Sequence, residues 1–168
     1  MKRFSFCLLI ITTIISLAAC NATSETSLDL ELPGDDMRAM GILIDFFQNL
    51  YTGEYEEAAR LYAGTYENMI NHNPEIDPQD HATLLRNACT INGAQCIRVK
   101  SIELQDKISS IEYIFTVEFQ NADNSLFVSG SCCGEEETEV LYHSVFSFRV
   151  SKNAEGNFQV MDMVPYVP

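Results

Sequence analysis

Residues 42–64 read ILIDFFQNLYTGEYEEAARLYAG, and this stretch decides the fold because it predicts two helices joined by a tight turn. Asp35 and Asp36, just ahead of it, are good N-cap residues for a first helix that runs through about Tyr51. Two neighbouring apolar stripes follow this helix, one made of Met40, Ile44, Phe47 and Tyr51 and the other of Leu43, Phe46 and Leu50. So wide an apolar surface is typical of a helix that packs deeply against a sheet.

The second half of the stretch predicts a chain reversal and a shorter helix. Gly53 lets the chain turn back, and the small Ala58 and Ala59 allow the two helices to approach closely. Gly64 is expected to end or bend the second helix. A short helical piece is predicted from Tyr66 to Asn71.

A further helix is predicted to begin at Asp77-Pro78, with Asp77 as N-cap and the proline in the first helical position. It would carry Leu84, Leu85 and Ala88 and end near Cys89-Thr90, before the turn signal Asn92-Gly93.

Beyond residue 93 the apolar period changes from near 3.6 to 2, which indicates strands. In the clearest one, Ile111, Tyr113, Phe115, Val117 and Phe119 share a face. The expected strands are Cys96–Gln105, Ile108–Asn121, Leu126–Gly130, Val140–Ser151 and Phe158–Val164. Helices followed by a run of strands predict an α+β domain, with N-terminal helices packed on a curved, cone-like antiparallel sheet.

The helix pair of residues 42–64 resembles the opening of the nuclear transport factor 2-like superfamily, also called the cystatin-like cone fold. In that family an apolar helix runs into a Gly-acid turn and then into a Tyr- and Ala-rich second helix. The resemblance extends over roughly Asp35 to Tyr166. The family includes isomerases, dehydratases, cyclases, ligand binders and protein-transport factors, so the fold alone does not assign a function.

The N-terminus resembles a bacterial lipoprotein signal. Lys2 and Arg3 precede an apolar run from Phe4 to Ser16, and Leu17-Ala18-Ala19-Cys20 has the form of a lipobox. The resemblance implies that residues 1–19 are cleaved, that Cys20 is lipidated, and that the protein is held on a membrane outside the cytoplasm. Two alternatives are an uncleaved anchor helix and an ordinary signal followed by a coincidental cysteine.

Residues 20–33 are expected to form the lipid anchor and a polar, acidic, flexible tether, and residues 34–168 a single domain. The formal charge of the whole chain is −14, and loss of Lys2 and Arg3 with the signal makes it −16. Nucleic acid and anionic headgroups should repel so acidic a chain, so the lipid on Cys20 must hold it at the membrane. A hydrophobic content of 46% excludes wholesale disorder.

Four cysteines follow Cys20, and an even set outside the cytoplasm favours disulfides. The favoured pairing joins Cys89 to Cys96 around the Asn92-Gly93 turn and leaves Cys132–Cys133 as a vicinal disulfide. Pairing between the two clusters, a four-cysteine zinc site and a redox-active vicinal pair are the alternatives, although the spacing is not that of paired zinc knuckles. The glutamates at 135, 136, 137 and 139 are expected to form a solvated acidic loop.

Asp162 is the candidate catalytic residue, with Tyr113 and His143 as possible companions. Asp162 is in phase with Phe158, Val160 and Val164, so its carboxylate could lie in the cone and act as a general base, as in isomerases of the resembled family. The alternative is that Asp162 pairs locally near a strand end and is inert. No Ser-His-Asp or Gly-rich phosphate motif appears, and no cofactor or metal is expected.

The favoured function is therefore non-catalytic binding of a small apolar ligand in the cone, or of a protein partner at the envelope. An isomerase-, dehydratase- or cyclase-type enzyme is the alternative, and it needs an open pocket around Asp162. A homodimer through the outer sheet face is a third possibility. It would need a broad apolar patch there, for which the candidates are Ile114, Leu141, Val145, Met161 and Met163.

Overall fold

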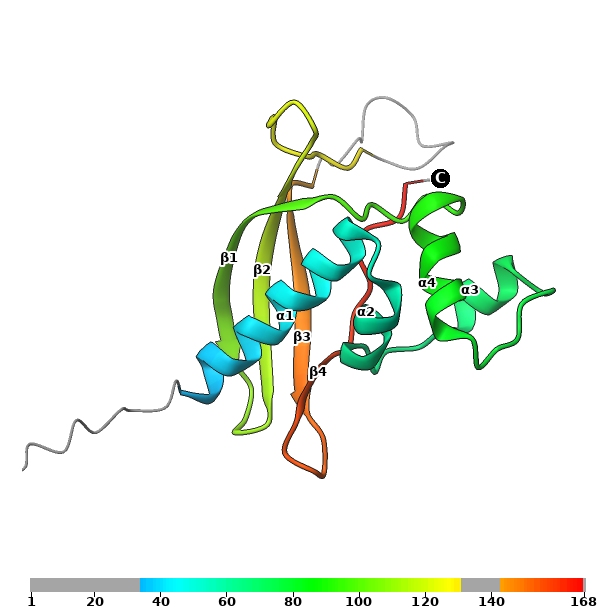
Figure 1. Ribbon diagram of the computed structural model, residues 1–168. Helices are drawn as coiled ribbons and strands as arrows, with labels where there is room; N and C mark the ends of the chain where they lie inside the picture. Colours follow the sequence, from blue (N-terminus) through cyan, green and yellow to red (C-terminus); the bar gives the residue numbers. More distant parts are fainter. Residues whose placement is uncertain (1–33, 131–142, 168) are drawn as a thin grey trace, which may run out of the picture. The chain divides into compact units, whose positions relative to one another are not determined.

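Four helices precede four strands in the part of the chain that the computed structural model describes, residues 34–130 and 143–167 (Figure 1). The helices are α1 (Asp35–Thr52), α2 (Tyr55–Leu61), α3 (Glu67–His72) and α4 (His81–Thr90). The strands are β1 (Arg98–Lys107), β2 (Glu112–Gln120), β3 (Val145–Lys152) and β4 (Phe158–Val160). The predicted α+β class is confirmed. The signal, Cys20 and the tether lie outside the described residues.

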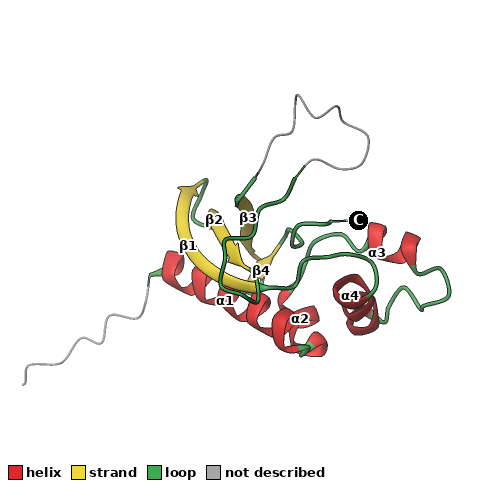
Figure 2. Cartoon of the chain, turned by 90° about the horizontal axis from the view of Figure 1, so that it is seen from above, coloured by secondary structure: helices red, strands yellow, loops and turns green. Residues whose placement is uncertain are grey.

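The strands form one antiparallel, curved sheet in the order β1-β2-β3-β4 (Figure 2). The β2–β3 register sets Tyr113 opposite Val150 and Phe115 opposite Phe148. Helix α1 contacts all four strands, whereas α2 contacts only β4 of the sheet and leads on to α3 and α4. The face that α1 covers is called the inner face below.

The core lies between α1 and the inner face. Tyr113, Phe115, Val117 and Phe119 of β2 alternate along this face and are all fully buried, as the period-2 pattern predicts. The ring of Phe47 from α1 meets Phe119 and Phe148 edge-on, at centroid distances of 5.3 and 4.9 Å. Burial of each such side chain stabilises the fold by about 1.5–3 kcal/mol.

Helix α4 begins later than the sequence predicts. Asp77 is not its N-cap; the Asp77 carboxylate instead accepts from the backbone N–H of Gln79 in a turn. Asp80 is the N-cap, and its side chain accepts from the backbone N–H of Thr83 at 3.1 Å. An aspartate followed by proline fits a turn as well as a helix start, and here the next aspartate caps the helix.

The predicted strand Leu126–Gly130 is also wrong as a regular element. This segment makes only isolated bridges, between Gln120 and Leu126 and between Ser129 and His143. Ile111, expected on the buried face of β2, precedes that strand and is exposed at its hairpin. The buried side of the β2 alternation therefore stops before Ile111, although the Ile111 carbonyl still accepts from the backbone N–H of Lys152.

The wide apolar face of α1 is only partly covered. Leu43, Phe46 and Leu50 are buried as expected, but Ile44 and Tyr51 from the neighbouring stripe are about half exposed. The helix therefore buries the Leu43, Phe46 and Leu50 stripe, together with Phe47 of the other stripe, and leaves Ile44 and Tyr51 half exposed beside β1.

Among the strands that the structure describes, β1 lies at an edge of the sheet and pairs with β2 alone. Its register shifts twice, between Val99 and Ser101 and between Leu104 and Asp106. Such irregularities bend a strand and increase its twist. Along β1 the side chains are mostly exposed and often charged.

Candidate functional site

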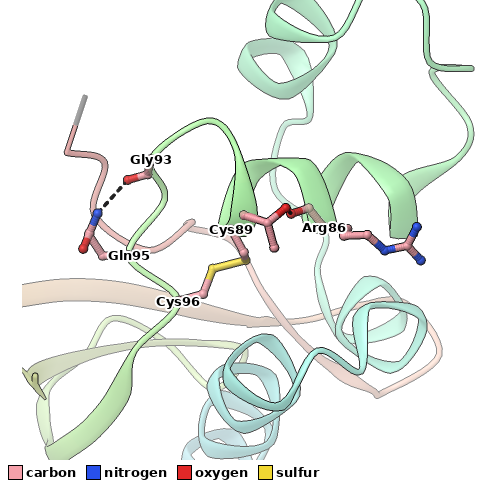
Figure 3. Close-up of a disulfide and its surroundings, with 6 residues drawn as sticks. Arg86, Cys89, Gly93, Gln95 and Cys96 are labelled. Atoms are coloured by element: carbon pink, nitrogen blue, oxygen red, sulfur yellow. Dashed lines mark hydrogen bonds between the residues drawn. A yellow bond between two sulfur atoms is a disulfide. The ribbon is translucent and has the colours of Figure 1, made fainter. Parts of the chain in front are cut away.

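Cys89 and Cys96 form a disulfide, which is the first of the pairings that the sequence suggests (Figure 3). Cys89 lies near the end of α4 and Cys96 two residues before β1, with their Cα atoms 5.4 Å apart. The bond closes the turn that contains Gly93, whose carbonyl accepts from the Gln95 side chain at 2.9 Å. These two sulfurs are therefore not open to zinc or to cross-pairing. Cys132 and Cys133 lie outside the described residues, as do the four glutamates of the predicted acidic loop.

Asp162 forms a local ion pair with Arg149. Its carboxylate accepts from the backbone N–H of Arg149 at 2.7 Å and pairs with the Arg149 guanidinium at 3.1 Å. Arg149 is exposed and alternates with the buried Phe148 and Val150, so this ion pair lies on the outer face of the sheet. The hydrogen bonds that the Arg149 guanidinium donates to the Asp162 carboxylate raise the pKa of Arg149. The carboxylate is thus held by a local partner on the outer face, as in the alternative in which Asp162 pairs locally near a strand end.

Tyr113 and His143 do not join Asp162 either. Tyr113 is fully buried on the inner face, where its ring meets Phe158 at a centroid distance of 5.7 Å. His143 is exposed, and its backbone pairs with Ser129 at the far end of β3 from Lys152. Six residues separate it from Arg149, the partner of Asp162, which is roughly 20 Å along an extended chain. The three residues make no common site.

The inner face leaves no space for the ligand that the sequence suggested inside a cone. A void wide enough for water would expose the atoms that line it, yet Tyr113, Phe115 and Phe119 have no exposed surface. Phe148 is equally packed, between Phe47 and Phe119. On the described part of this face, side chains of the protein itself occupy the place where the ligand was expected.

The outer face does not present the broad apolar patch that a homodimer through it would need. Ile114 and Val145 lie there, but Thr116, Glu118 and Ser147 stand among them. Met163 packs against the core instead. Leu141 lies outside the described residues.

A groove of about 530 Å³ lies between α1, α2 and the hairpin that joins β3 to β4. We call it the helix–hairpin groove. Its lining residues are Arg38, Gly41, Ile42 and Asp45 of α1, Arg60 and Leu61 of α2, and Asn153, Asn157, Phe158 and Gln159 of the hairpin. Its size is in the range of pockets that hold small molecules, about 300–1,000 Å³.

Apolar side chains and polar side chains both line this groove. Ile42, Leu61 and Phe158 are half-buried or buried. The guanidinium of Arg38 lies over the Phe158 ring, 5.7 Å from its centroid. Asn153 donates from its side-chain amide to the Gln159 carbonyl oxygen at 3.3 Å. An apolar surface bounded by a few fixed polar groups can hold a ligand and set its orientation.

Among the described residues, each arginine of the groove forms an ion pair with an acidic residue one turn earlier. Arg38 pairs with Asp35 at 3.1 Å, and Arg60 pairs with Glu57. Exposed pairs of this kind contribute about 0–1 kcal/mol each. An incoming anionic group can therefore exchange with either carboxylate at little cost.

Gly41 is a groove residue that the sequence analysis missed. A methyl group added at Gly41 would meet no atom within 4 Å, so packing does not require glycine there. Glycine in a helix interior costs about 1 kcal/mol relative to alanine. A glycine in the middle of α1 that packing does not require is the sequence signal that could have pointed to this side of the helix.

A second groove, of about 380 Å³, lies between α1 and β1. The half-exposed Ile44 and Tyr51 of α1 line it on one side, and Val99, Lys100 and Ile102 of β1 on the other. It is smaller than the helix–hairpin groove and lacks the paired amides.

Within residues 34–130 and 143–167, no group of three or more His, Cys, Asp or Glu side chains is placed to hold a metal ion. No helix in the same ranges is both long enough and apolar enough to cross a membrane. No protein-family model matches the chain, and no curated protein matches it.

Proposed function

We propose that the chain is a lipid-anchored lipoprotein of the bacterial cell envelope, whose nuclear transport factor 2-like domain binds a ligand without catalysing a reaction. The lipobox Leu17-Ala18-Ala19-Cys20 supports both the location in the cell envelope and the lipid anchor. The α+β architecture is compatible with the resembled family. The binding site is the helix–hairpin groove.

The observation that carries the binding function is the composition of this groove. An apolar surface at Ile42, Leu61 and Phe158 lies beside two arginines and an amide pair. The ligand class that fits is an amphipathic molecule or an extended peptide with an apolar body and an anionic or amide group. In a chain of charge −14, two arginines at one groove also provide local attraction for an anion.

A non-catalytic role fits the placement of the candidate residues. Asp162 is engaged by Arg149 on the outer face, and Tyr113 is buried away from it. The groove contains one carboxylate, Asp45, and two guanidiniums that remain protonated at any physiological pH. These three side chains are better suited to bind a ligand than to transfer a proton.

Native mass spectrometry of the mature protein, purified from cells that make it, tests this proposal. Gly41→Phe places a ring in the groove at a position where a side chain meets nothing, and Gly41→Ala is the matched control with a single methyl group. We expect wild type and Gly41→Ala to retain an extra mass that disappears on denaturation, and Gly41→Phe to lose it.

A protein partner is detected by photo-crosslinking in intact cells, with the crosslinking residue at the exposed Asp45 in the groove or at Thr116 on the outer face. We expect a discrete adduct from the Asp45 position that Gly41→Phe abolishes, and none from Thr116. Absence of both the retained mass and the adduct, or an adduct insensitive to Gly41→Phe, would reject the groove as the binding site.

A further inference from the structure

The start of α1 lies at one end of the fold, beside the β1–β2 and β3–β4 hairpins (Figure 1). Lys152, at the end of β3, links these elements: its Nζ lies 2.5 Å from the Asp35 carboxylate at the start of α1. Its backbone N–H donates to the Ile111 carbonyl in the β1–β2 hairpin at 2.7 Å. The chain therefore enters the domain next to this hairpin.

The same end exposes large apolar side chains. Ile108 and Ile111 flank the turn of the β1–β2 hairpin and are 53% and 50% exposed, and Met37 in the first turns of α1 is 57% exposed. We call these three residues the apolar tip. Single exposed apolar residues are ordinary on protein surfaces, but these three lie on elements that share one end of the fold with the start of α1 in the view of Figure 1.

The hairpin at this tip satisfies much of its own backbone. The Ser109 N–H donates to the Glu112 carbonyl at 3.2 Å, and the Ile111 N–H donates to the Ser109 hydroxyl at 3.2 Å. A backbone whose polar groups are bonded internally loses less when it leaves water for a lipid interface. The residues between the two isoleucines are serines, which add no charge.

We propose that the apolar tip rests in the headgroup region of the membrane that holds the protein. This inference rests on the proposed lipid anchor. Residues 21–33 separate Cys20 from Gly34, so the lipid on Cys20 can lie at most about 50 Å from the start of α1. The tether therefore holds the tip near the bilayer at a high effective concentration, so that a weak apolar contact suffices.

The apolar tip contacts the lipid surface rather than a protein. The reason is that Gly34, where the tether ends, precedes α1 at this end of the fold, whereas the other exposed apolar residues lie elsewhere. Ile91, at the end of α4, is 71% exposed but lies away from the start of α1 (Figure 1). Overall negative charge opposes adhesion of the rest of the surface to anionic lipid. The tip orients the domain on the membrane and leaves the helix–hairpin groove beside it accessible.

Fluorescence tests this orientation, because the chain contains no tryptophan and any introduced one is a sole reporter. Mature Ile108→Trp and Ile111→Trp proteins are bound to phosphatidylcholine vesicles with brominated acyl chains, and Ile91→Trp is the matched control. Intact mass establishes first that each protein carries acyl chains. We expect the two tip reporters to shift to shorter wavelength and to lose intensity several-fold, with Ile91→Trp unchanged.

Acylated, vesicle-bound proteins whose tip reporters are not quenched would overturn the tip contact while leaving the anchor in place. Equal quenching at all three positions would overturn it too, because the domain would then have no fixed orientation. Proteins without acyl mass would overturn the anchor and the tip contact together. Hydrogen exchange of the Ile108–Ile111 amides in wild type gives a second readout, which should slow on vesicles if the tip is in contact.

Discussion

At the scale of single residues, two glycines with opposite roles give a matched prediction. A methyl group at Gly41 meets nothing, whereas one at Gly64 would overlap the Met161 carbonyl oxygen and the Tyr62 hydroxyl. Gly41→Ala should therefore stabilise the protein by about 0.5–1 kcal/mol, through helix propensity and a more restricted unfolded chain. Gly64→Ala should destabilise it by about 1–3 kcal/mol, through overpacking.

Urea unfolding of the two variants beside wild type measures both effects. The two substitutions are chemically identical, so general consequences of adding a methyl group cancel in the comparison. Equal shifts of the same sign would contradict the assignment of Gly64 as a close-approach position.

The position of Asp162 could not be predicted from the sequence, because it depends on a contact between two different elements. The alternation of Phe158, Val160 and Val164 put Asp162 in phase with core residues, but the strand ends at Val160 and the alternation ends with it. The partner that holds Asp162 is Arg149 on the neighbouring strand, and no spacing within one strand identifies it. Tyr62 is buried, and burial raises its pKa to about 12, with the nearby Asp162 adding to the effect.

At the scale of elements, the Cys89–Cys96 disulfide fixes the end of α4 to the chain that enters β1. The bond closes a short loop, with a sequence separation of 7, and should contribute about 2–3 kcal/mol by restricting the unfolded chain. We expect Cys89→Ser/Cys96→Ser to lose that amount while the sheet still forms. Guanidinium unfolding followed by circular dichroism measures the loss, and a variant as stable as oxidised wild type would contradict it.

The sequence predicts the order and type of most elements because local periodicity decides them. Helices α1, α2 and α3 and strand β2 appear within a few residues of their predicted bounds. Prediction failed where tertiary pairing decides: Leu126–Gly130 alternates like a strand but pairs only at isolated bridges. It also failed on the flank of α1 that borders β1, since an apolar stripe does not reveal whether another element covers it.

At the scale of the whole molecule, carboxylates at several junctions make the fold sensitive to acid. Four of them have pKa values below the ordinary range, because side chains donate hydrogen bonds to them in the folded state: Asp35, Asp80, Glu118 and Asp123. Their principal donors are Lys152, Thr83, Ser101 and Ser125, respectively. They join α1 to β3, cap α4, link β1 to β2 and close the loop after β2.

A carboxylate whose folded pKa is lowered contributes stability above its unfolded value, and that contribution is lost as pH falls through the folded value. The ordinary values are 3.8 for aspartate and 4.5 for glutamate. We therefore expect the urea midpoint to be steady near neutral pH and to fall progressively below about pH 4. Asp123→Asn, which keeps an acceptor oxygen but cannot titrate, should show a shallower decline; an unchanged pH profile would contradict the role of that residue.

The irregular, charged edge of β1 affects how copies of the protein can associate with one another when they are crowded. Proteins held by lipid on one surface meet one another at high density and in similar orientations, which favours strand-to-strand addition between copies. Two register shifts in β1, together with charged residues such as Arg98, Lys100 and Glu103, make this edge a poor template for another strand. This edge therefore disfavours the assembly of crowded copies of the protein into fibrils through the sheet.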